Sequence, residues 1–143
     1  MKNIKLILFI LIFTNIAYSH NTLKDFSTDG CSIVPDGPPN DPNKWKNCCV
    51  DHDISYWMGG TSTDREISDL IFRYCMEKTG SPEWAIVYYL GVRINAWPGS
   101  GQSFQWGYGW IKNRGYKPLS RSQYLEAISR LPEDPYSLPY TNQ

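Results

Sequence analysis

The sequence predicts a small all-α domain, linked by disulfides and built on two long antiparallel helices that carry a candidate active site. Three observations favour this class: helix start and stop signals divide the chain, a short glycine-containing connection joins the two longest predicted helices, and four cysteines follow an export-type segment. A third helix and an irregular C-terminal part rich in aromatic residues and glycine should complete the domain.

Residues 1–19 have the composition expected of a signal peptide. Two lysines lie among the first five residues, residues 6–13 form an unbroken apolar run, and Ala-Tyr-Ser at 17–19 is a small-x-small cleavage sequence. The apolar run is too short to span a bilayer. We therefore expect a protein that is secreted or periplasmic after cleavage, with residues 20–143 as one mature domain in which cysteines pair.

Length and charge narrow the possible partners. The mature domain of 124 residues is long enough for one core. It keeps 12 basic and 14 acidic residues, so neither a nucleic acid nor a purely electrostatic membrane partner is expected. We expect a monomer whose core lies within residues 27–97, while residues 20–27 are polar and uninformative.

The helix pair follows from its terminal signals. Asp41-Pro42 should act as N-cap and first residue of a helix over residues 42–58, which Gly59-Gly60 ends. A capping box at residues 63–66 starts the second helix, which should end near Lys78. The short connection predicts that the helices are antiparallel and packed together.

The rest of the chain is less regular. Pro82 should open a third helix that reaches about Ala96. The aromatic, glycine-rich residues 97–110 should form a loop or a hairpin, packed on the core or resting at a lipid surface. Ser120 or Ser122 opens a short fourth helix that ends near residue 130. The proline-rich tail, 131–143, should be extended or mobile.

The first predicted helix concentrates reactive groups on one face. Cys49, His52, Asp53 and Tyr56 follow the i, i+3, i+4, i+7 spacing. A base beside a hard oxygen ligand is what metal-assisted hydrolysis requires. The alternative is a surface His-Asp pair next to structural cysteines.

Asp69 should lie across the helix pair from His52. His52 is six residues before Met58, and Asp69 is six residues after Thr63, which places the two at about the same height. The carboxylate would then accept a hydrogen bond from the ring, fix its tautomer and stabilise the imidazolium. Otherwise Asp69 is an ordinary solvated helix residue.

Four cysteines allow three disulfide pairings, of which the vicinal one is the least favoured. Because Cys48 and Cys49 point about 100° apart on a helix, each should find a different partner. A zinc site at Cys48, Cys49, His52 and Cys75 is an alternative that needs reduced thiols. A phosphohydrolase built on His-Asp would need more than the two histidines of this chain.

The pattern Cys-Cys-x-x-His-Asp-x-x-Tyr at residues 48–56 resembles the secretory phospholipase A2 family, in its short bacterial and fungal branch. The resemblance covers about residues 27–76. It implies a calcium-dependent hydrolase that releases the sn-2 fatty acid of glycerophospholipids at a membrane or micelle surface. It also implies His52 as the general base, Asp69 as its orienting partner and Tyr56 as a support for Asp69. Core packing is the alternative role of Tyr56.

The resemblance further implies the disulfides Cys31–Cys49 and Cys48–Cys75. The first would bring the loop at residues 29 and 30 to the metal position. Calcium ligands would then be Asp29, the carbonyl of Gly30 and Asp53, since calcium prefers several oxygen ligands.

The resemblance also bears on the oxyanion donor and on a second candidate ligand in this loop. An amide near Cys31 should stabilise the oxyanion. Asp36 is a second candidate ligand, although Asp-Gly beside a proline is more simply a turn. The loop departs from the animal enzymes, because residues 32–35 stand where those have glycines. A non-catalytic binding or toxin module with the same fold is the alternative function.

Overall fold

The structure is a computed structural model that describes residues 22–139. It contains the helices α1 (Lys46–Met58), α2 (Ser62–Lys78), α3 (Pro82–Asn95) and α4 (Arg121–Arg130), and the 3-10 helix η1 (Pro135–Ser137). In this part of the chain the only strand-like pairing is one isolated bridge, between Leu23 and Trp110. The predicted all-α class is confirmed. The predicted signal peptide lies outside the described residues.

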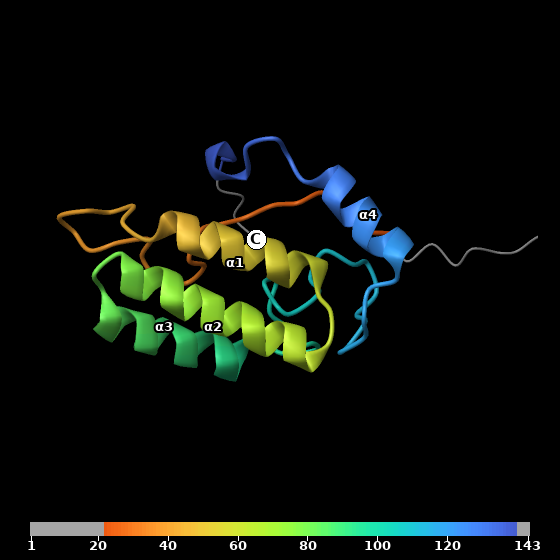
Figure 1. Cartoon of the computed structure of the whole chain (residues 1–143), viewed down its shortest axis with the longest axis horizontal. Coiled ribbons are helices and arrows are strands. Elements are labelled where there is room, and N and C mark those ends of the chain that lie inside the picture. Colours follow the sequence, from red (N-terminus) through yellow and green to blue (C-terminus); the bar gives the residue numbers. More distant parts are fainter. Residues whose placement is uncertain (1–21, 140–143) are drawn as a thin grey trace, which may run out of the picture.

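The helix pair has the predicted arrangement (Figure 1). α1 and α2 run antiparallel, and α3 returns along the other side of α2. α4 and η1 lie on the side of α1 away from α2. None of the helices within residues 22–139 is long and apolar enough to cross a membrane.

α1 forms the centre of the core because it is covered on two sides. Toward α2 and α3 it packs with a cluster that includes Trp45, Met76 and Tyr88. On its other side, Val50 and Trp57 pack with a second cluster and are fully buried. A helix buried on both sides holds its side chains in fixed positions, which suits it to carry a site.

The predicted start of the first helix at Pro42 is wrong. Residues 41–45 form turns, and α1 begins at Lys46. The amide of Trp45 donates instead to the carbonyl of Asp36, at 2.9 Å. This bond ties the proline-rich segment to the base of α1, so the chain enters the helix one turn later than its capping signal predicts.

The predicted capping box of α2 is also displaced. Thr61, not Thr63, is the N-cap: its hydroxyl accepts from the Asp64 amide at 3.1 Å. The Asp64 carboxylate accepts in return from the Thr61 amide at 2.8 Å. Asp64 therefore occupies the reciprocal N3 position, where an acidic side chain is favoured.

Two segments outside the helices pack against α1. Residues 20–27 were expected to be uninformative, but Leu23 and Phe26 are buried in its second cluster. The aromatic segment is a loop rather than a hairpin. The indole of Trp106 donates to the carbonyl of Gly60, just beyond α1, at 3.0 Å, and that of Trp110 donates to the last carbonyl of α1 at 2.7 Å, so these two rings cap the core.

The tail is more ordered than predicted up to residue 139. It forms η1, and the hydroxyl of Tyr136 donates to the carboxylate of Asp51 on α1, at 2.7 Å. This bond fixes the tail across the solvent side of α1, away from the reactive face.

Candidate active site

Both disulfides join the cysteines that the resemblance implied. Cys31 pairs with Cys49 at a Cα–Cα distance of 5.0 Å, and Cys48 pairs with Cys75 at 5.7 Å. The first ties the loop before α1 to that helix, and the second ties α1 to α2. No cysteine is free, so the zinc alternative is excluded. Two disulfides in a small domain are compatible with an extracellular location.

His52 and Asp69 meet across the helix pair. Nε2 of the ring lies 2.8 Å from Oδ1 of the carboxylate, and the two residues are 7% and 0% exposed. The register counted from the helix ends therefore places them correctly. A carboxylate accepts the Nε2 hydrogen, which leaves Nδ1 as the lone-pair nitrogen.

Tyr56 combines the two roles considered for it. Its hydroxyl donates to Oδ1 of Asp69 at 2.8 Å and accepts from Nε of Arg65 at 2.9 Å. Its ring packs edge-on against Trp106 in the core, with centroids 4.9 Å apart. Burial raises the pKa of Tyr56 far above its ordinary value, so the phenol keeps the hydrogen that it donates.

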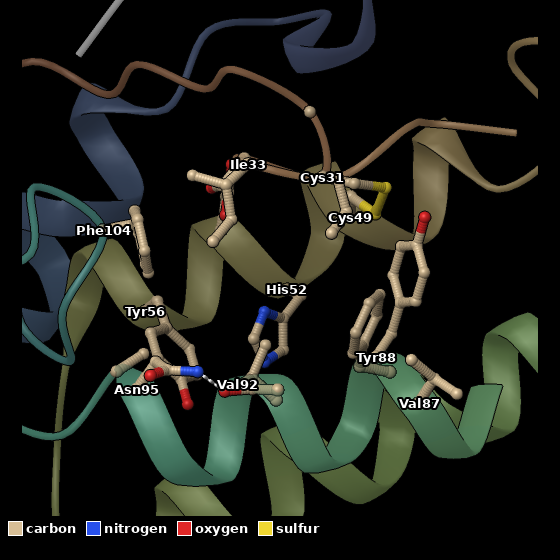
Figure 2. A pocket seen from close by; sticks show the side chains of 17 residues that line it. Cys31, Ile33, Cys49, His52, Tyr56, Val87, Tyr88, Val92, Asn95 and Phe104 are labelled. Carbon is tan, nitrogen blue, oxygen red and sulfur yellow. Dashed lines mark hydrogen bonds between the residues drawn. A yellow bond between two sulfur atoms is a disulfide. The ribbon is translucent and has the colours of Figure 1, made fainter. Parts of the chain in front are cut away.

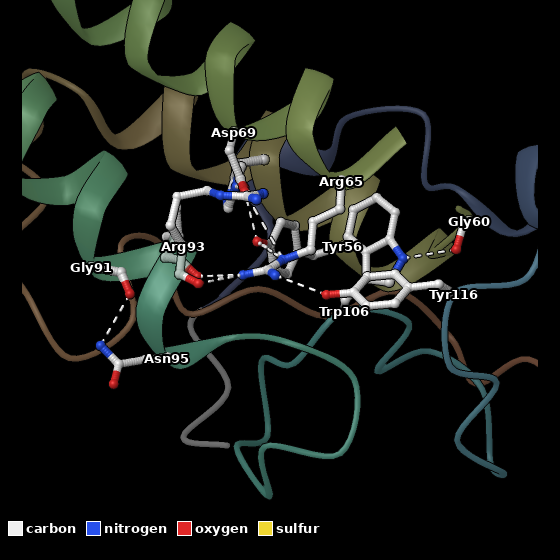
Figure 3. Close-up of polar contacts among 11 residues, drawn as sticks. Tyr56, Gly60, Arg65, Asp69, Gly91, Arg93, Asn95, Trp106 and Tyr116 are labelled. Atoms are coloured by element: carbon white, nitrogen blue, oxygen red, sulfur yellow. Dashed lines mark hydrogen bonds and ion pairs between the residues drawn. The ribbon is translucent and has the colours of Figure 1, made fainter. Parts of the chain in front are cut away.

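Two arginines that the sequence analysis did not single out complete the surroundings of Asp69 (Figure 3). Nη1 of Arg93 lies 2.8 Å from Oδ2. Arg65 is 4% exposed, and its Nη2 donates to the carbonyl of Val92 at 2.7 Å. Its Nη1 donates to the hydroxyl of Tyr116 at 2.9 Å. Only the i, i+4 spacing of Arg65 and Asp69 on α2 was available as a sequence signal.

The charges of this network favour a neutral base beside an ionised acid. Burial lowers the pKa of His52, and the hydrogen bond to Asp69 opposes that shift only in part. Burial raises the pKa of Asp69, but the hydrogen bonds from His52, Arg93 and Tyr56 outweigh it, so that the pKa is lowered. At neutral pH the imidazole of His52 can therefore accept a proton, and the ionised carboxylate of Asp69 would stabilise the imidazolium that forms.

The ring of His52 faces a cavity of about 270 Å³ between the loop that follows Gly30 and α3 (Figure 2). Among the described residues we find no hydrogen-bond partner for Nδ1. The walls are mostly apolar and come from α1, α2, α3 and the aromatic loop; they include Val34, Phe72, Val87, Val92, Ala96 and Phe104. Ile33 at the mouth is 83% exposed. An apolar molecule in this cavity would lie against the base.

Asp53 is a buried carboxyl group beside the cavity. It is 7% exposed, accepts a hydrogen bond from the Thr28 hydroxyl at 2.6 Å and forms no ion pair with a basic side chain of the described residues. Burial raises its pKa well above the ordinary value, and the charges of Asp29 and Asp36 raise it further. A bound cation would supply the missing positive charge.

The ligand types around Asp53 fit calcium. The Cys31–Cys49 disulfide brings the loop of Asp29 and Gly30 beside α1, and Gly30 lines the cavity. Asp29 also accepts from the Ser32 hydroxyl at 2.9 Å. All of these candidate ligands are oxygen atoms, as calcium prefers.

One other group of possible metal ligands lies close by. The carboxylate of Asp36 and the sulfurs of Cys31 and Cys49 lie within 4.8 Å of one another. Both sulfurs belong to a disulfide, so they offer no thiolate and the group does not form a soft-metal site.

No family model, curated protein or solved structure matches the chain.

Proposed function

We propose that the protein is a secreted, calcium-dependent hydrolase that releases the sn-2 fatty acid of glycerophospholipids. The observation that carries the proposal is the placement of His52: one ring nitrogen is bound to Asp69, and the ring faces an apolar cavity. The acidic, oxygen-rich surroundings of Asp53 at the same cavity support the choice of calcium.

In this proposal His52 and Asp69 move the proton. Nδ1 takes a hydrogen from water as its oxygen attacks the ester carbonyl carbon, and Asp69 stabilises the imidazolium that forms. The tetrahedral intermediate then expels the glycerol oxygen, which receives the proton from Nδ1. Tyr56 and Arg93 hold the two oxygens of Asp69, so that its orientation does not change between these steps.

Calcium would be held by Asp29, the carbonyl of Gly30 and Asp53. When bound, it supplies positive charge that polarises the ester carbonyl and stabilises the oxyanion. Asp53 is suited to this task because its fixed position on a buried helix limits how far it can move.

The walls of the cavity suit an acyl chain. Val34 and Val87 line it and are also partly exposed, at 40% and 57%, and Ile33 is almost fully so. Apolar side chains that face both the cavity and the surface would let the acyl chain of a lipid pass from a membrane or micelle surface to the base through apolar contacts.

A non-catalytic binding or toxin module is the second candidate, because the same apolar cavity would hold a lipid without turnover. The two functions differ in whether they need His52, because hydrolysis requires a base and lipid binding does not. Binding to vesicles that persists in a protein unable to release fatty acid would favour the module.

The test is fatty-acid release from phospholipid vesicles whose sn-1 and sn-2 chains differ, with calcium or with a chelator. We expect the sn-2 acid alone, and only with calcium. Release of the sn-1 acid, or release that the chelator does not suppress, would contradict the proposal. Vesicle binding is measured in parallel by sedimentation.

A further inference from the structure

We propose that Asp36 is a positioning residue: its carboxylate fixes the Gly30–Cys31 peptide so that the Gly30 carbonyl faces the cation, and it is not itself a cation ligand. This inference rests on the proposed calcium-dependent function. It assigns a task to a residue whose sequence context indicated only a turn or a second ligand.

The carboxylate of Asp36 is bound to the loop at short range. Its Oδ1 accepts a hydrogen bond from the amide of Cys31, at 2.7 Å. Glycine suits position 30, because its φ is +73° and a Cβ atom there would overlap Oδ1 of Asp36.

The geometry of a peptide unit then orients the carbonyl. The described residues contain no cis peptide bond, and in a trans unit the N–H and C=O groups point in opposite directions. Because the Cys31 N–H points to Asp36, the Gly30 carbonyl points away from it. Gly30 and Cys31 line the cavity and Asp36 does not, so that direction leads toward the cavity.

The Gly30–Cys31 peptide cannot both direct its carbonyl at a cation and donate its N–H group to the oxyanion. With its carbonyl directed at a cation, the Cys31 amide faces the other way and is already bound to Asp36. The Cys31 amide is therefore not available as the oxyanion donor, a role that the resemblance implies for an amide near this residue. The Gly30 amide is bound as well, to the Thr28 hydroxyl at 3.1 Å.

Asp36 is suited to fix the loop because its own backbone is held by the helices. Its carbonyl accepts from the amide of Trp45, at 2.9 Å. The preceding carbonyl, of Pro35, accepts from the indole of Trp45 at 2.9 Å and from the hydroxyl of Tyr88 at 2.6 Å. The Cys31–Cys49 disulfide fixes Cys31, whose amide donates the hydrogen bond to Asp36. Both partners of the bond are thus fixed before any cation binds.

Two substitutions separate positioning from direct ligation. Asp36→Asn keeps a side-chain oxygen that can accept from the Cys31 amide, whereas Asp36→Ala removes it. A direct carboxylate ligand would be damaged by both. Asp41→Ala, an exposed aspartate in the same proline-rich segment, is the matched control.

The experiment uses the oxidised mature protein and two measurements. Hydrogen exchange of the Cys31 amide is followed by NMR in chelator, and calcium binding is measured by calorimetry. Asp36→Ala should speed the exchange and weaken calcium binding, each by about tenfold or more, as expected for one lost hydrogen bond to a charged acceptor. Asp36→Asn should stay within about threefold of the wild type in exchange and clearly closer to it than Asp36→Ala in calcium affinity.

The outcomes distinguish this inference from the function on which it rests. If the wild type binds calcium and Asp36→Ala matches it in both measurements, positioning by Asp36 is overturned and the proposed function stands. Equal loss of calcium binding in both variants would make Asp36 a ligand and also overturn the inference. A wild-type protein that binds no calcium would overturn the proposed function together with the inference.

Discussion

Oδ2 of Asp69 lies 2.8 Å from Nη1 of Arg93, while Oδ1 of the same carboxylate lies 2.8 Å from Nε2 of His52. Arg93 of α3 therefore binds one oxygen of the Asp69 carboxylate, and His52 of α1 binds the other. An orienting carboxylate works only if it does not rotate, and this division of its oxygens prevents rotation.

Arg93→Ala should destabilise the protein by about 1–2 kcal/mol, because it removes a charge-assisted hydrogen bond from a fully buried carboxylate. Partial solvent exposure of the arginine keeps the figure at the low end for such a bond. Urea unfolding measures it. Arg73→Ala, which breaks the partly exposed Arg73–Glu77 pair, is the control and should cost about 0.3–0.5 kcal/mol. Equal effects of the two substitutions would argue against a special role for Arg93.

His52→Gln should lower the rate of fatty-acid release by a factor on the order of 10²–10⁴, because it removes the ring nitrogen that the proposal assigns as the base. Circular dichroism should show an unchanged fold. The control is Ser55→Ala, on the same helix but bound only to the backbone, at 3.4 Å. Turnover close to that of the wild type would remove His52 from the mechanism.

Asp53→Asn should abolish the stabilisation that calcium confers. A ligand that binds only the folded state at 100 times its Kd adds about 2.7 kcal/mol. Thermal unfolding with calcium and with chelator measures this difference. Asp51→Asn, an exposed aspartate two residues away, should keep the calcium shift. A calcium shift of full size in Asp53→Asn would show that the cation binds elsewhere.

The pKa of Asp69 predicts how stability depends on pH. Because the folded-state pKa is lowered, the carboxylate stabilises the fold at every pH above its ordinary value near 3.9, and this contribution is lost as the pH falls through the folded-state pKa. The difference in unfolding free energy between the wild type and Asp69→Asn should therefore shrink below about pH 4. Denaturant unfolding in chelator from pH 7 to pH 3 measures it. A difference that grows as the pH falls would reverse the assigned shift.

Counting along the helices was enough to find the His52–Asp69 contact. Both residues lie in regular helices joined by a short connection, so their heights follow from the rise per residue. The same count could not find Arg93, because it reaches Asp69 from α3, and the approach of α3 depends on how the apolar faces pack.

The errors at the two helix starts have different causes: a distant acceptor displaces the start of α1, whereas Thr61 and Asp64 form a local capping box that competes with Thr63 at the start of α2. Pro42 and Thr63 carry good local signals for a helix start, yet α1 begins at Lys46 and α2 is capped by Thr61. In the first case a distant acceptor, the carbonyl of Asp36, takes the amide of Trp45. Local propensity is weaker than a bond that packing makes available.

By itself the sequence determined the helical class, the antiparallel pair and the face that carries Cys49, His52, Asp53 and Tyr56, since these depend on short-range spacing. Tertiary structure alone decided that Arg93 reaches Asp69, that Thr28 meets Asp53 and that Asp36 accepts a hydrogen bond from the Cys31 amide. Such contacts join different segments of the chain, and their geometry is set by the packing of the helices and the disulfides rather than by any local pattern.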